Sequence, residues 1–249
     1  MTLNAVLEEM RLLFYEPRTL RAWERLCALL DRCPPERAFI AVDYAEEHMR
    51  TWGWPDHLRI APQAWLEALF AQGRDPRMRL VRVAAVDDRP RLSLDDVAAL
   101  SRCDELDRLL SLDLRYREVC SEGVALLARA PLMTCLRRLD LGFNRVDDEG
   151  AVALAEAACP LTDLDLRYNR VGTEGLIALL DSPVFERVER LELEGNNLDD
   201  RAVDALVLRA GRLPALKVLG LAGNPISPGS SGSLQRAFSA TPGFRCSAP

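Results

Sequence analysis

The chain has 249 residues, 49% of them hydrophobic, and a formal net charge of −6 at pH 7. This apolar content allows a continuous core, and the acidic balance argues against a nucleic-acid partner, because proteins that bind nucleic acids usually present a basic patch. The seven cysteines include no C-x-x-C pair, which disfavours a zinc site and is typical of free thiols in a reducing cytoplasm.

Residues 1–9 contain two acids and no basic segment, so they do not resemble a signal peptide. No apolar run approaches the roughly 18 residues that a membrane span needs. We therefore expect a cytoplasmic protein that does not contact membranes. Every basic residue except Lys217 is arginine, which is typical of coding bias in a GC-rich bacterial genome.

Residues 1–76 carry no repeat and predict a helical N-terminal cap. Apolar residues fall on one helical face within residues 3–14, 20–30, 39–49 and 65–70. We expect these helices to cover the open end of the repeats that follow. The tryptophans are expected to serve the core of this cap; they are Trp23, Trp52, Trp54 and Trp65.

A solenoid of one degenerate and five clear repeats is predicted over residues 77–228. The clear repeats begin at residues 109, 136, 161, 188 and 216 and follow the pattern L-x-x-L-x-L-x-x-N-x-L. The pattern predicts parallel strands near residues 111–114, 138–141, 163–166, 190–193 and 218–221, each followed by a helix. The degenerate repeat is expected to use Leu80, Val83 and Ala85 as its strand and residues 94–100 as its helix.

The ninth repeat position predicts a ladder of side-chain amides that bond buried backbone groups of adjacent turns. Arg117 replaces the asparagine in the first clear repeat, so the ladder is expected to begin one repeat later. Its members are Asn144, Asn169, Asn196 and Asn224. Residues 229–249 are expected to form a C-terminal cap and tail, with a short helix around residues 234–238.

The repeats resemble the leucine-rich-repeat family. Their length of about 27 residues, with a full helix, resembles the ribonuclease-inhibitor-like subfamily, which includes ribonuclease inhibitor and the Ran GTPase-activating protein. The resemblance covers residues 105–228 approximately. It implies an α/β fold, a right-handed solenoid with parallel strands inside and helices outside, and it implies that function depends on the residues of the inner face.

Two rows of side chains distinguish the inner face: an acid at the fifth position of four repeats and an aromatic residue at the eighth position of three. Strands about 4.8 Å apart bring four carboxylates close enough to repel unless arginines or a cationic partner compensate. Aromatic residues beside charges are typical of binding hot spots. The predicted partner-binding residues are Asp113, Arg115, Tyr116, Arg138, Asp140, Phe143, Asp165, Arg167, Tyr168, Arg190 and Glu192.

These rows can also arise without a role in binding. The arginines can simply neutralise the acids on a solvated strand face, and duplication of a gene segment copies a residue without selecting it. A metal site formed by Asp113, Asp140 and Asp165 is disfavoured, because neighbouring carboxylates are an expected by-product of repetition.

Catalytic signatures are weak. The two histidines, His48 and His57, have no nucleophile at motif spacing, and the sequence contains neither a Gly-rich phosphate loop nor G-x-S-x-G. We therefore predict a protein-binding module without enzymatic activity or cofactor, such as a scaffold, adaptor or inhibitor, whose protein partner presents a basic patch. The alternative, implied by the resemblance, is a regulator of a small GTPase.

Overall fold

The structure, a computed structural model, describes residues 1–247 without the side chains of Trp52 and Ser231. Its strands form one parallel sheet in chain order. They are β1 (Val83–Ala85), β2 (Ser111–Asp113), β3 (Arg138–Asp140), β4 (Asp163–Asp165), β5 (Arg190–Glu192), β6 (Val218–Gly220) and β7 (Arg245–Ser247). The five strands predicted from the clear repeats are confirmed.

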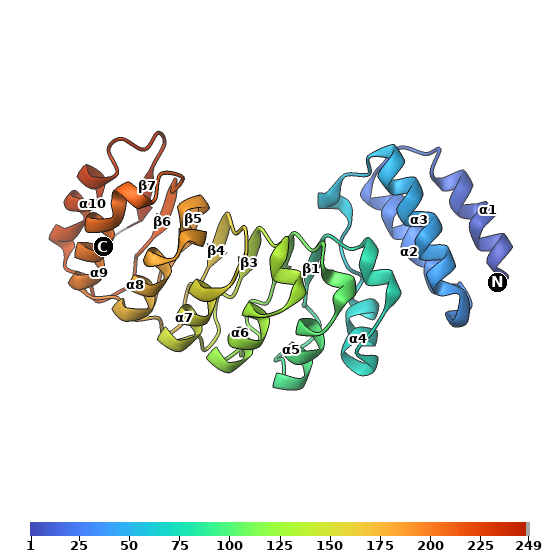
Figure 1. Cartoon of the computed structure of the whole chain (residues 1–249), viewed down its shortest axis with the longest axis horizontal. Helices are drawn as coiled ribbons and strands as arrows, with labels where there is room; N and C mark the ends of the chain where they lie inside the picture. Colours follow the sequence, from blue (N-terminus) through green and yellow to red (C-terminus); the bar gives the residue numbers. More distant parts are fainter. Residues whose placement is uncertain (248–249) are drawn as a thin grey trace.

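Helices precede and alternate with these strands. They are α1 (Leu3–Leu13), α2 (Leu20–Asp31), α3 (Ala38–Trp52), α4 (Gln63–Gln72), α5 (Leu94–Ser101), α6 (Ser121–Ala128), α7 (Asp148–Glu156), α8 (Thr173–Asp181), α9 (Asp200–Arg209) and α10 (Ser231–Ala237). Figure 1 shows the strands along one side of an arc and α4 to α9 along the other, with α1 to α3 packed at the N-terminal end. This arrangement confirms the predicted solenoid with strands inside and helices outside.

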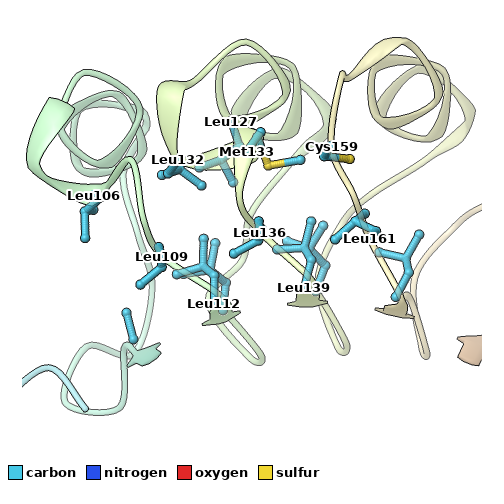
Figure 2. Close-up of a cluster of buried hydrophobic side chains, with 14 of the residues drawn as sticks. Leu106, Leu109, Leu112, Leu127, Leu132, Met133, Leu136, Leu139, Cys159 and Leu161 are labelled. Carbon is cyan, nitrogen blue, oxygen red and sulfur yellow. The ribbon is translucent and has the colours of Figure 1, made fainter. Parts of the chain in front are cut away.

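The core is a stack of equivalent leucines. The strand register places Leu112 opposite Leu139, and Leu139 opposite Leu164. All three are buried, and Figure 2 shows the first two among the leucines that lie between the strands and the helices. Because each repeat buries its leucines only against its neighbours, the stack stabilises the array rather than any single repeat.

The degenerate repeat has its strand where the sequence predicted it, but in a register shifted by one residue. Ala84, not Val83, aligns with Leu112 and points into the core. Leu80 lies in a 3₁₀ helix, Pro76–Leu80, rather than in the strand. The prediction was wrong because an alanine stands where the other repeats have leucine. The helix predicted at residues 94–100 is confirmed as α5.

Strand pairing continues on the N-terminal side of β1. Ile60 forms a parallel bridge with Val83, and the Arg59 carbonyl accepts hydrogen bonds from the backbone N–H groups of Arg82 and Val83. In addition, α4 packs on α5 in the outer row of helices (Figure 1). The strand and helix layers therefore extend into residues 59–72, while the domain boundary at residue 76 stays a prediction.

Tryptophans join the cap to the sheet. The indole N–H of Trp23 donates to the Ile60 carbonyl at 2.7 Å, and that of Trp65 donates to the Asp31 carboxylate at 2.6 Å. Both rings are buried, as is that of Trp54, so these three confirm the predicted core role. The side chain of Trp52 lies outside the described residues.

The asparagine ladder is confirmed. All four amides are buried and bond backbone groups of their own and the preceding repeat. The ladder begins at Asn144, as predicted. Arg117, expected to have no place in it, donates from Nε to the Val86 carbonyl, which corresponds to the Leu114 carbonyl bonded by Asn144. The guanidinium thus supplies the donor function of the missing amide from a half-buried position.

At the C-terminal end, α10 confirms the predicted short helix, and β7 adds a strand that the sequence did not predict. All seven cysteines are free, four of them buried. None of the helices within residues 1–247 is long and apolar enough to cross a membrane.

Candidate functional site on the concave face

The acidic row follows the strand register. Asp113 pairs in register with Asp140, Asp140 with Asp165, and Asp165 with Glu192. Each of the three aspartates accepts the backbone N–H two residues later, at 2.9–3.0 Å. Because such a bond turns the chain out of the strand, the aspartates have a local structural role in addition to any role in binding.

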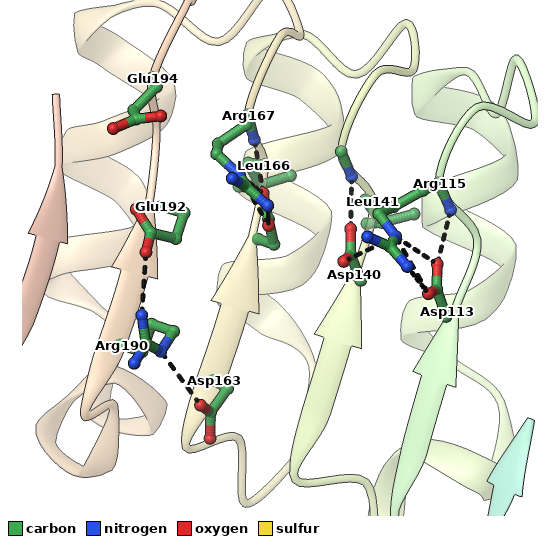
Figure 3. A network of polar contacts seen from close by, with 12 residues as sticks. Asp113, Arg115, Asp140, Leu141, Asp163, Leu166, Arg167, Arg190, Glu192 and Glu194 are labelled. Carbon is green, nitrogen blue, oxygen red and sulfur yellow. Dashed lines mark hydrogen bonds and ion pairs between the residues drawn. The ribbon is translucent and has the colours of Figure 1, made fainter. Parts of the chain in front are cut away.

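Arginines neutralise most of this row (Figure 3). Arg115 lies 2.6 Å from Asp113 and 3.2 Å from Asp140, and Arg167 lies 2.6 Å from Asp165. Arg190 contacts Glu192 at 3.1 Å. The carboxylates are therefore compensated within the chain. This favours the interpretation in which arginines and acids neutralise each other on the strand face, and it leaves less attraction for a basic partner.

Asp140 is the exception in the row. Its repeat has Gly142 at the seventh position, where the flanking repeats have Arg115 and Arg167, so Asp140 has no arginine of its own. Burial, together with the charges of Asp165 and Asp113, raises its pKa to about 6 against the opposing effects of the Gly142 N–H and Arg115. Asp140 is thus the carboxyl group that would gain most from an added cation.

The aromatic row is a continuous stack. The ring centroids of Tyr116 and Phe143 are 4.2 Å apart with planes 18° from parallel, and those of Phe143 and Tyr168 are 4.4 Å apart at 17°. We call these three residues the aromatic ladder. Tyr116 and Tyr168 are 56% and 53% exposed. Stacking therefore covers the ring faces between neighbours, and the ladder presents ring edges and two phenol hydroxyls.

The backbone at the eighth position is left-handed in every clear repeat. Tyr116, Phe143 and Tyr168 have φ of 58°, 56° and 52°, and Gly195 and Gly223 have 65° and 70°. Glycine adopts this conformation without strain, whereas for other L-residues it has a steric cost. The aromatic ladder thus occupies positions where the next two repeats have glycine.

The ladder ends at Gly195 for a steric reason. A Cβ atom on Gly195 would lie 2.6 Å from the Tyr168 ring, so the ring packs directly over the glycine backbone. A fourth aromatic residue at this position would require Tyr168 to move. The sequence showed the row of three, but neither their stacking nor their backbone conformation.

A groove of about 200 Å³ runs across strands β2 to β5 on the concave face. Five of the predicted residues line it: Asp113, Arg138, Asp140, Asp165 and Arg190. The aromatic ladder lies beyond the C-terminal ends of the same strands. The structure therefore divides the predicted site into a charged groove and an adjoining aromatic ladder.

Asp163 was not among the predicted partner-binding residues. It lies 3.8 Å from Arg138 and 3.6 Å from Arg190, and it lines the groove between them. The alternation of arginine, aspartate and arginine at the third position of three successive repeats was the available signal.

His48 lies away from the concave face, and His57 lies at its edge. His48 Nδ1 is 2.8 Å from the Tyr44 carbonyl, and its ring stacks on Phe14. His57 lines a separate cavity next to the first strands. Among residues 1–247, no group of three or more His, Cys, Asp or Glu side chains has an arrangement that could hold a metal ion.

A leucine-rich-repeat family model matches residues 133–155 and 157–180. Comparison with curated proteins finds no match.

Two solved structures are similar at low identity. An internalin from Listeria monocytogenes is 16% identical over 69% of this chain and 48% of its own, with a TM-score of 0.46. A leucine-rich-repeat protein from Leptospira interrogans is 18% identical over 70% of this chain and 51% of its own, with a TM-score of 0.41. The chain spans about half the length of each. The matched repeats and the register of strands and helices show that this chain carries leucine-rich repeats and folds as a leucine-rich-repeat solenoid.

Proposed function

We propose that the chain is a protein-binding module, acting as a scaffold, adaptor or inhibitor, and that its partner lies on the concave face and contacts the aromatic ladder. The observation that carries this proposal is the left-handed backbone of Tyr116, Phe143 and Tyr168. Leucine-rich repeats generally mediate contacts between proteins, which supports the same conclusion.

Strain in the left-handed backbone of the ladder opposes the energy gained by ring stacking. A non-glycine residue in the left-handed region costs about 1–2 kcal/mol. The two stacked ring pairs return about 0.5–1.5 kcal/mol each, and the tyrosine rings remain more than half exposed. Folding alone therefore gains little from these rings over glycine, and contact with a partner is the use that accounts for them.

Asp140 indicates which charge the partner carries near the aromatic ladder. We propose that a cationic side chain from a basic patch on the partner approaches this carboxyl group, because it lacks an arginine of its own. Asp140 only shares Arg115 with Asp113, whereas each of the other acids is contacted by an arginine of its own repeat, so their contribution to affinity is small. Charges of this kind mainly accelerate association, whereas buried aromatic anchors mainly slow dissociation.

The test compares binding kinetics for the parent chain and the variant Tyr116→Gly/Tyr168→Gly, using a partner isolated from the source organism. Glycine fits the left-handed backbone, so the variant should keep its fold, with stability changed by about 1 kcal/mol or less. Dissociation should be about 30-fold faster, equivalent to about 2 kcal/mol.

The matched control is Leu208→Ala, which truncates an exposed apolar residue on α9. It should dissociate as slowly as the parent. Unchanged kinetics in the double glycine variant would refute the proposal and point to another surface.

We also propose that the chain acts by binding alone, in the reducing environment of the cytoplasm, and that its repeats are of the ribonuclease-inhibitor-like kind. The repeat length of about 27 residues supports the subfamily, and the free cysteines support the compartment. A catalytic or GTPase-regulating role would be revealed by accelerated GTP hydrolysis when the chain is mixed with small GTPases of the source organism.

A further inference from the structure

A second cavity, of about 330 Å³, lies at the N-terminal ends of β1, β2 and β3. We call it the cationic pocket and define it by Asp56, His57, Ser111, Arg137 and Arg138, which line it together with Val83 and Leu110. Ser111 and Arg138 also line the charged groove. The pocket therefore adjoins the groove, at the edge of the concave face opposite the aromatic ladder.

Two buried arginines lie behind this pocket. Arg59 and Arg82 are only 6% and 8% exposed. Both have Asp56 as their ion-pair partner, at 3.5 Å and 3.7 Å from the same carboxylate oxygen. One half-exposed carboxylate thus serves two buried guanidinium groups, so positive charge exceeds negative charge at ion-pair distance beside the pocket.

The arginines that line the pocket add to this excess. Arg137 is exposed, and its side chain makes no ion pair with any residue in the described part of the chain. Within residues 1–247, the one ion pair of Arg138 is the 3.8 Å contact with Asp163, a carboxylate that it shares with Arg190. The pocket wall therefore carries two guanidinium groups with most of their donors available.

Burial is the main influence on the pKa values of the buried pair. Burial, together with the charge of Arg82, lowers the pKa of Arg59 to about 10 against the effects of Asp56 and Glu46. Burial likewise lowers the pKa of Arg82. An anion placed nearby would stabilise the charged form of both groups.

We propose that the cationic pocket binds an oxyanion, a carboxylate or phosphoryl group carried by the protein that occupies the groove. Arg137 and Arg138 supply the guanidinium donors, which suit the planar, two-oxygen edge of such a group. The hydroxyl of Ser111 makes no hydrogen bond within residues 1–247 and adds a further donor, as does the ring of His57. This inference rests on the proposed function for the source of the anion, but the pocket itself can be tested without a partner.

The test follows the melting temperature of the full chain in rising concentrations of inorganic phosphate, against sodium chloride at matched ionic strength. The parent chain should show a saturable rise with phosphate beyond the chloride control, because a ligand that binds only the folded state stabilises it. In Arg137→Gln/Arg138→Gln, whose substituted side chains are both exposed, the rise should disappear. In the parent, the Nε–H resonance of Arg138 should shift with phosphate.

Two variants serve as controls. Arg170→Gln removes an exposed arginine that does not line the pocket, and Tyr116→Gly/Tyr168→Gly removes the exposed rings. Both should respond to phosphate as the parent does. An equal response of the parent and Arg137→Gln/Arg138→Gln, or no response of the parent and no shift at Arg138, overturns the inference while leaving the aromatic ladder in place.

With the partner in hand, Arg137→Gln/Arg138→Gln should weaken binding about tenfold. Phosphatase treatment of the partner identifies the source of the anion: loss of this tenfold difference indicates a phosphoryl group, and its persistence indicates a carboxylate. If the double arginine variant binds the untreated partner as the parent does, the pocket does not contribute to recognition.

Discussion

At the scale of single residues, Asn169 shows how one side chain joins two repeats. Its amide nitrogen donates to the carbonyls of Leu141 at 2.8 Å and Leu166 at 3.1 Å. Its amide oxygen accepts from the Val146 N–H at 2.9 Å. These backbone groups lie in the buried wall of the solenoid, where no water replaces a lost partner.

Replacing Asn169 with alanine should therefore lower the free energy of unfolding by about 1–3 kcal/mol. Arg117→Ala should cost less, because Arg117 replaces only the donor function of the amide and its side chain is partly exposed. Urea denaturation of the two variants and the parent measures both costs. Equal losses would contradict the role assigned to the buried amide.

The raised pKa of Asp140 predicts that the stability of the fold decreases as pH rises. Its pKa is about 6 in the folded chain against an ordinary value of 3.8, so the folded state holds its proton more tightly than the unfolded state. Stability from this group is fully present below about pH 4 and is lost as pH rises through 6. Asp140→Asn should remove this loss.

We expect Asp140→Asn to be more stable than the parent at pH 7.5, by on the order of 1–3 kcal/mol, with no gain below pH 4. The asparagine oxygen can still accept the Gly142 N–H. Asp113→Asn, which loses an ion pair with Arg115, should show no such gain. Melting curves across this pH range decide the matter: a variant that gains equally at pH 3.5 and 7.5 would show that the charge is not the cause.

At the scale of elements, the cap closes the exposed edge of the sheet at residues 59–61. The Trp23 indole, from α2, supplies a donor to the Ile60 carbonyl on that edge. Unpaired strand edges otherwise invite pairing with other chains. In contrast, Trp54 Nε1 is buried without a hydrogen-bond partner in the described part of the chain.

These two tryptophans therefore predict opposite effects of the same substitution. Trp23→Phe leaves the Ile60 carbonyl without its donor and should destabilise the chain by about 1–3 kcal/mol. Trp54→Phe removes an unsatisfied polar group, which offsets the loss of buried ring area. This variant should therefore change the stability little. Thermal melting of both variants is the measurement, and a larger loss for Trp54→Phe would contradict this account of the cap.

The sequence predicts elements where leucine repeats and fails where small or polar residues replace it. The strands β2 to β6 follow from the leucine pattern. The register of β1 was shifted because Ala84 holds the leucine position, and β7 was missed because Cys246 holds it. The aromatic row was visible in sequence, but its left-handed backbone was signalled only by Gly195 and Gly223 at the same repeat position.

For the site, the sequence predicted the residues of the two rows but not their pairing. Which carboxylate each arginine contacts depends on side-chain conformations that a repeat pattern does not specify. The absence of an arginine from the Asp140 repeat was readable as Gly142, but its effect on the pKa depends on burial. The cationic pocket combines Asp56 and His57 with distant repeat positions, so only the fold brings it together.

At the scale of the whole molecule, the arc follows from two packing distances. Neighbouring strands lie about 4.8 Å apart, whereas packed helices need about 8–10 Å. Stacking both in one array therefore bends it with the strands on the inner side, as Figure 1 shows. The bend gathers equivalent side chains of successive repeats onto one concave surface, with the aromatic ladder along one edge and the cationic pocket at the other.

Hydroxyl-radical footprinting of the partner complex tests the central claim, that the partner covers this concave surface, most directly. Tyr116 and Tyr168 are more than half exposed in the free chain and should be oxidised readily, as should Phe39 on α3, which is 54% exposed. In the complex, the account predicts that oxidation of Tyr116 and Tyr168 slows severalfold while that of Phe39 is unchanged. Unchanged oxidation of both tyrosines, with protection of Phe39 or of Leu208 on the convex side, would contradict it.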